Sequence, residues 1–139
     1  MTPGIPSQFE RPKNTAYALF TFDVLLVNIT AAGDVITSFT PGFVGSIVRT
    51  FFIQDTPVTT GAKGATLNWE INAVNLVGGT IVLTSALCTP LGAVINGAAI
   101  IGSNSFDRDD TISLEAASVT PFSEGKGSVV LVIAIPILS

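Results

Sequence analysis

Apolar and polar residues alternate with a period of two along several short stretches of this 139-residue chain. The clearest stretch is residues 67–71, where Leu, Trp and Ile alternate with Asn and Glu, and residues 16–26 show a similar pattern. A period of two places successive side chains on opposite faces of a β-strand. Since no stretch keeps a helical period of 3.6, the pattern predicts an all-β fold.

Other segments rich in β-branched and aromatic residues predict further strands. The expected strands cover residues 16–26, 35–39, 46–54, 67–72, 80–84, 98–101, 111–115 and 128–135. Gly78-Gly79 is typical of a hairpin turn, and residues 85–102 show no clear period, so we expect a short helix or a turn there, before the strand at residues 98–101. About eight short strands separated by Gly and Pro predict a β-sandwich or jelly roll.

The last expected strand, residues 128–135, is apolar on both faces. A strand with this composition is typical of a sheet that is covered by another layer on each side. We therefore expect this strand to lie between two layers.

The first 15 residues contain Pro3, Pro6 and Pro12 and are expected to form an extended arm, because proline removes a backbone donor and fixes φ. The arm is either a terminus without fixed structure or a segment that reaches across a neighbouring subunit. Residues 16–139 are long enough for one hydrophobic core, so a single β-sandwich domain is expected.

Composition argues against several classes of function. The net charge is −4, and six Lys and Arg residues are dispersed along the chain, so nucleic acid is not an expected partner. The longest apolar run, residues 129–138, is about half the ~20 residues of a membrane-spanning helix, so no membrane association is expected. The N-terminus does not look like a secretory signal, so the chain is expected to fold in a cytoplasm.

The sequence contains no His and a single Cys, Cys88. Histidine is the usual general base and the commonest zinc ligand, so we expect neither an enzyme nor a bound cofactor or transition metal. Cys88 lies among Leu, Thr and Pro with no cation nearby in sequence, which favours a small core residue over a nucleophile.

Three weaker candidates for chemistry remain. Residues 107–110 contain three Asp, which could hold calcium with Asn104 or simply cap a turn, and the second interpretation is favoured. Trp69 could stack on a sugar, but its alternation with Leu67 and Ile71 favours the core. Glycoside cleavage would need two of Glu70, Glu115 and Glu124 to meet in the fold, and their spacing does not predict that they do.

Two runs, ITAAGDVITSFTPGFVGSIV (residues 29–48) and TSALCTPLGAV (residues 84–94), resemble small virion structural proteins of tailed bacteriophages. The group closest in size is the capsid decoration or cement proteins. This resemblance implies a β-rich protein, often a homotrimer, that binds the major capsid protein or another virion protein on the outer shell and stabilises it in the virion, after assembly in the host bacterial cytoplasm.

By the same resemblance the N-terminal arm is the anchor to its partner. Its expected contact residues are Pro3, Ile5, Pro6, Phe9, Arg11 and Pro12. The low charge of the chain, 12%, suits a surface buried between subunits. The alternative function is a carbohydrate-binding or receptor-binding head domain of a phage tail fibre.

Overall fold

A computed structural model describes residues 15–137 of the chain. All but the last residue of the predicted N-terminal arm lies outside the described residues, and so do its six expected contact residues, Pro3, Ile5, Pro6, Phe9, Arg11 and Pro12.

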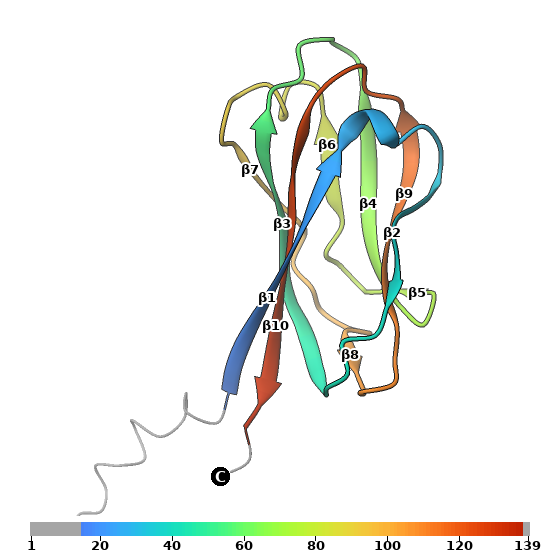
Figure 1. Cartoon of the computed structure of the whole chain (residues 1–139), viewed down its shortest axis with the longest axis vertical. Coiled ribbons are helices and arrows are strands. Elements are labelled where there is room, and N and C mark those ends of the chain that lie inside the picture. The colour runs from blue at the N-terminus through green and yellow to red at the C-terminus, as the bar shows by residue number, and fades with distance from the viewer. Residues whose placement is uncertain (1–14, 138–139) are drawn as a thin grey trace, which may run out of the picture.

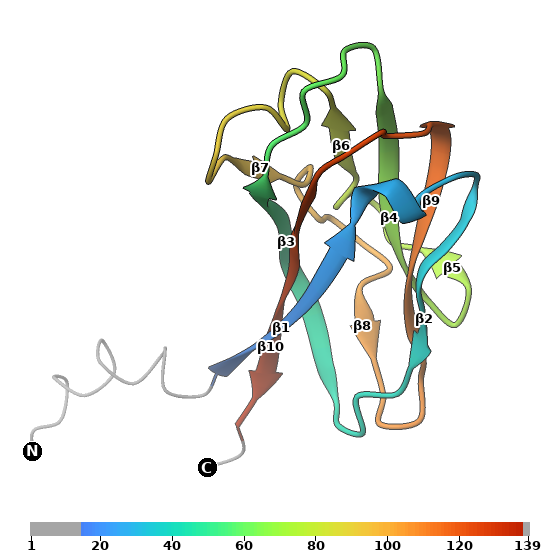
Figure 2. The same cartoon turned by 45° about the horizontal axis from the view of Figure 1, so that its top comes forward.

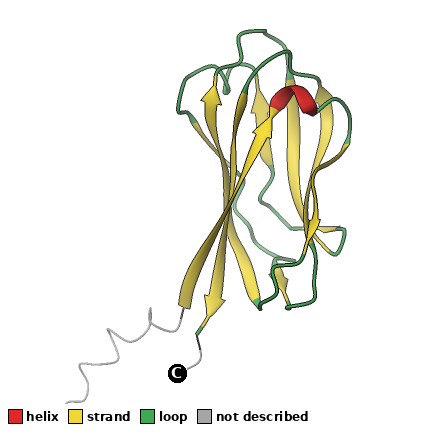
Figure 3. Ribbon diagram, in the orientation of Figure 1, coloured by secondary structure: helices red, strands yellow, loops and turns green. Residues whose placement is uncertain are grey.

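The described residues form strands and a single turn of 3-10 helix, with no α-helix (Figure 3). The elements in chain order are β1 (Thr15–Leu25), η2 (Leu26–Asn28), β2 (Gly33–Phe39), β3 (Gly45–Thr56), β4 (Gly64–Ile71), β5 (Val74–Asn75), β6 (Ile81–Thr84), β7 (Val94–Asn96), β8 (Ser105–Phe106), β9 (Ile112–Thr120) and β10 (Lys126–Pro136). The predicted all-β fold is confirmed.

The strands form two antiparallel sheets that pack face to face (Figures 1 and 2). Sheet A has the order β1-β10-β3-β7, with β8 also paired to β3, and sheet B has the order β2-β9-β4, with β5 and β6 paired to β4. Without the two-residue strands β5 and β8, each sheet has four strands. This order, in which the chain crosses repeatedly between the sheets, is that of a jelly roll.

Two local predictions were wrong. Residues 98–101, expected to form a strand, have an irregular backbone. They form backbone hydrogen bonds with residues 77–80, for example from Ala98 N–H to the Thr80 carbonyl at 3.0 Å. The strand of this region is β7, which directly precedes residues 98–101 in the chain and pairs with β3. The residues around 85–92 form turns, as expected.

Gly78-Gly79 is also not the predicted hairpin turn. The hairpin is made by Asn72 and Ala73, which join β4 to β5 with φ of 50° and 64°. Both values are left-handed, as in a two-residue type I′ turn. Gly78 is needed instead for a close approach, because a Cβ there would lie 1.9 Å from the carbonyl oxygen of Ala99.

The core lies between the two sheets and is centred on Trp69, which is 1% exposed. The indole N–H of Trp69 on β4 donates to Thr50 Oγ1 on β3 at 2.7 Å, and that hydroxyl donates to the carbonyl of Val130 on β10 at 2.9 Å. Phe22 packs beside the indole, with the ring centroids 6.0 Å apart. The prediction that Trp69 belongs to the core is confirmed.

The layers around β10 differ from the prediction. Val129, Leu131 and Ile133 on its inner face are fully buried in the core. Its outer face is covered by no second layer of the described residues, since sheet B packs on the inner side alone (Figure 1). β10 is therefore apolar on both faces, as predicted, but residues 15–137 cover only one of them.

The link between Trp69 and Thr50 can be tested by replacing Thr50 with Val, which keeps the shape and removes the acceptor. We expect a loss of about 1–3 kcal/mol in the free energy of unfolding, since a buried N–H loses its partner. Urea unfolding followed by far-UV circular dichroism measures this change. The double variant Thr50→Val/Trp69→Phe should cost less than the two single changes summed, because they remove one shared bond.

The matched control is Thr37→Val, at an exposed position on β2, which should change stability by less than about 0.5 kcal/mol. Equal losses for Thr50→Val and the control would contradict a structural role for this bond.

Candidate functional site

The two sheets present very different outer surfaces. On the outer side of sheet A, most side chains of its strands that lie between the level of Tyr17 and the level of Asp23 on β1 are apolar. The apolar members, named here the apolar face, are Tyr17, Leu19, Phe51, Ile53, Val94, Val130, Val132 and Ala134. They come from β1, β10, β3 and β7, which are neighbours in the sheet.

The apolar face is partly open to solvent. Tyr17 is 67% exposed, Leu19 65% and Val94 51%, whereas Val130 in the middle is 6% exposed. In an antiparallel sandwich the solvent side of a strand ordinarily carries polar residues. A large exposed apolar patch on one face instead marks a site of contact with another molecule.

Two charged residues lie among these apolar side chains. The Arg49 guanidinium stacks over the ring of Phe51, 4.5 Å from its centroid, and donates to Asn96 Oδ1 at 2.8 Å. Asp23 accepts a 3.3 Å hydrogen bond from the hydroxyl of Ser128. Among residues 15–137 neither residue forms an ion pair, since the pair found there joins Lys126 to Asp55.

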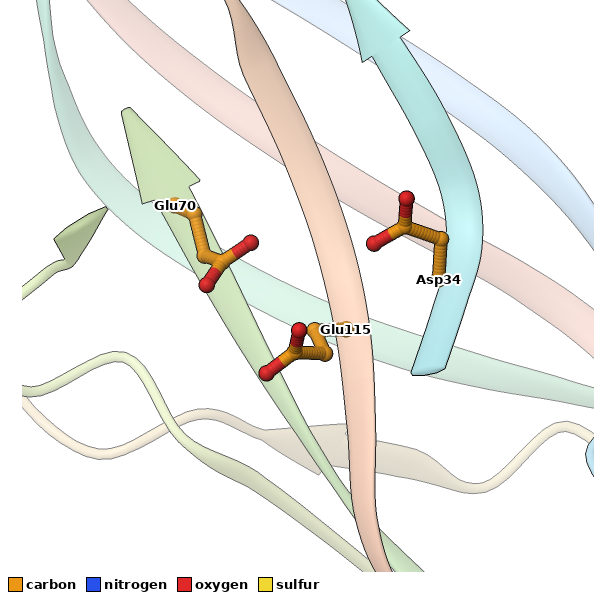
Figure 4. A group of neighbouring side chains, drawn as sticks. All are labelled: Asp34, Glu70 and Glu115. Carbon is orange, nitrogen blue, oxygen red and sulfur yellow. The ribbon is translucent and has the colours of Figure 1, made fainter. Parts of the chain in front are cut away.

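The outer side of sheet B carries a cluster of three carboxylates (Figure 4), with the exposed Val82 of β6 on the same side. Asp34 on β2, Glu115 on β9 and Glu70 on β4 come from adjacent strands, and their nearest carboxylate oxygens lie within 4.8 Å of one another. Glu70 is 9% exposed and accepts a 3.1 Å bond from the hydroxyl of Ser113.

The structure thus brings together two of the three glutamates considered in the sequence, with Asp34 added. Glu124 lies elsewhere and accepts bonds from Thr59 Oγ1 at 2.9 Å and Thr60 Oγ1 at 2.7 Å. These bonds hold the pKa of Glu124 below its usual range, with Thr60 contributing most. Asp34 could not be assigned to the cluster from sequence, because its pairing with Glu115 depends on the register of β2 and β9.

The carboxylate cluster offers hard oxygen ligands, which suit calcium or magnesium better than a transition metal. None of the three main cavities of residues 15–137 is lined by all three carboxylates. A cavity of about 400 Å³ between the end of β1 and the start of β2 includes Asp23 and Asp34, but neither Glu70 nor Glu115. Carboxylates on an open sheet surface do not exclude water from a reacting bond, which disfavours glycoside cleavage here.

The aspartates of residues 107–110 close a turn, as the favoured interpretation predicted. Asp110 Oδ2 accepts from the Asp107 backbone N–H and Oδ1 from Asn72 Nδ2, both at 2.8 Å. The bond from Asp107 is the main reason that the pKa of Asp110 is lowered. Asn104 points elsewhere and donates to the Ile47 carbonyl at 2.7 Å.

Cys88 is fully buried, in agreement with the predicted core role. Burial raises the pKa of its thiol to about 11. At neutral pH the thiol is therefore protonated, and the thiolate needed for nucleophilic chemistry is scarce.

No model of a known protein family matches the chain, and no curated protein resembles it significantly. Within the described residues, no helix has the length and apolar character to cross a membrane. The apolar face of sheet A is therefore the candidate functional site on physical grounds alone.

The carboxylate cluster generates a prediction of its own. Three close carboxylates on adjacent strands repel one another, so Glu115→Gln should raise the midpoint of thermal unfolding at pH 7 in chelator-treated protein. The matched control is Asp109→Asn, at an exposed position outside the cluster. A lowered midpoint for Glu115→Gln would contradict the repulsion.

Proposed function

We propose that this protein is a structural component of a bacteriophage virion, a decoration protein that binds the outer capsid shell and stabilises it. It works through contacts between protein surfaces and not through catalysis. The observation that carries this proposal is the apolar face of sheet A, which a solvated monomer would leave uncovered.

Covering this face with protein is energetically favourable. Full burial of a large apolar side chain contributes about 1.5–3 kcal/mol, and Tyr17, Leu19 and Val94 are each at least half exposed. The centres of protein interfaces are depleted of charge and enriched in aromatic residues and Arg, as this face is. Sheet B, with its carboxylates, is suited to remain in water.

The viral context rests on the sequence resemblance and on the class of fold. The runs at residues 29–48 and 84–94 resemble virion proteins of tailed phages. Jelly rolls occur in viral capsid and lectin domains, which agrees with this context by analogy. The proposed anchor to the shell is the N-terminal segment, with the β-sandwich as the body that joins subunits.

The features of the chain give less support to the other classes of function. The aromatic residue that motivated a glycan-binding head, Trp69, is in the core, and the exposed Tyr17 lies among apolar side chains. For catalysis, the chain has no His, and its thiol is buried.

Removing residues 1–13 should abolish attachment to the shell and leave the β-sandwich folded. The measurement is co-sedimentation: the purified protein is mixed with phage particles that lack this protein, and the mixture is centrifuged. The full chain should pellet with the particles, and the truncated chain should stay in solution. The emission of Trp69 should be equally blue-shifted in both forms, because Trp69 is 1% exposed and packs in a core of residues from the described range 15–137.

The matched control keeps the segment and changes one of its residues, Phe9→Ser, which should weaken co-sedimentation less than truncation does. Full occupancy by the truncated chain would overturn the anchoring role. A full chain that binds no particle would overturn the proposed function.

A further inference from the structure

We propose that two copies of this protein pair through their apolar faces about a twofold axis that passes over Val130, with Asp23 of each copy on Arg49 of the other. The inference rests on the apolar face as a protein-contact surface, and it does not depend on attachment to a viral shell. The occupant of the face is thus a second copy of the same chain.

The strand register places the two charges symmetrically about Val130. Val130 on β10 pairs with Thr21 on β1 and with Phe51 on β3. Asp23 lies two residues after Thr21, and Arg49 lies two residues before Phe51. Both point outward, as shown by their bonds to the outward side chains of Ser128 and Asn96. Val130 is therefore the midpoint of the diagonal from Asp23 to Arg49.

A face with this pattern is complementary to itself. When two copies pack face to face, their twofold axis lies in the contact plane. A residue on one side of this axis then lies opposite the residue that occupies the mirror-related position, on the far side of the axis, in the other copy. An axis through Val130, perpendicular to the diagonal, exchanges the Asp23 and Arg49 positions. Two opposite-charge contacts then form, and like charges are kept apart.

The same two residues cannot pair within one copy. They are separated by two strand spacings and four residues along the strands, which amounts to roughly 17 Å. Within residues 15–137, Asp23 hydrogen-bonds with the neutral Ser128, and Arg49 hydrogen-bonds with the neutral Asn96 and stacks on Phe51. Their charges are therefore available to a second copy.

The apolar residues of the face supply the area for the contact. Leu19 and Ile53 lie near the proposed axis on either side of Val130, so each would meet its own counterpart. Four strands at a spacing of about 4.8 Å and six residues at a rise of about 3.4 Å give a face of roughly 400 Å² per copy, which is at the low end for a specific interface. The pair should therefore form at micromolar concentrations rather than nanomolar ones.

The test is sedimentation equilibrium of the full chain over about 1–200 µM, a range that spans a micromolar dissociation constant. The expected result is a reversible change from monomer to dimer. Leu19→Arg, which places a charge on the axis at a solvent-accessible position, should weaken dimerisation at least about tenfold. The matched control Ile101→Arg, at a residue 78% exposed outside the face, should leave the dimer unchanged.

Charge exchange tests the twofold geometry itself. Arg49→Asp and Asp23→Arg should each weaken the dimer, because each places like charges opposite one another. The combined variant Arg49→Asp/Asp23→Arg should recover most of the lost affinity. Thermal unfolding of each variant checks that the fold is retained.

Each contrary result has a separate meaning. A monomer over the whole concentration range, or a trimer, would overturn the twofold pair. If Leu19→Arg weakens assembly but the combined charge variant recovers nothing, the face is a contact surface and the proposed axis is wrong. A monomer that still co-sediments with phage particles would overturn this inference and leave the proposed function in place.

Discussion

The hydrogen bond from the Trp69 indole to Thr50, and from Thr50 to the Val130 carbonyl, is the contact on which the arrangement of the two sheets depends. It joins an inner strand of sheet B to two neighbouring strands of sheet A, and all three residues are buried. Because side chains alternate along a strand, an inward Thr50 requires Arg49 and Phe51 to point outward. The interaction that organises the core thus also determines which residues form the outer face.

The outer faces of the two sheets differ in composition. One carries carboxylates from three strands, and the other is mostly apolar, with one Arg and one Asp on either side of Val130. The apolar residues on the outer side of β10 lie outside the core cluster between the two sheets. Their presence is explained if another protein surface supplies the second layer. A jelly roll with one adhesive face is well suited to join a larger assembly.

Much of the fold could be predicted because its signals are local. The alternation around Trp69 is a property of five consecutive residues, and it correctly predicted the strand, the buried face and the core position. The position of β7 could not be predicted, because Ala98 and its neighbours are stabilised by bonds to residues far away in sequence. The clustering of Asp34 with Glu70 and Glu115, and the diagonal of Asp23 and Arg49, depend on register between strands. The sequence does contain the signal for the candidate site, the apolar character of both faces of residues 128–135, but it does not say which molecule covers the second face.

The central claim is that the apolar face is covered by protein when the molecule assembles, and Tyr17 reports on it directly. It is the single Tyr of the chain and the most exposed residue of that face. In protein labelled with 3-fluorotyrosine, the fluorine resonance can be followed by NMR in H₂O and D₂O as concentration increases. The account predicts that the resonance moves with concentration and that its solvent isotope shift decreases, as expected for a ring that leaves water. A full isotope shift at every concentration, in samples that sedimentation shows to be assembled, would mean that the molecules join through another surface.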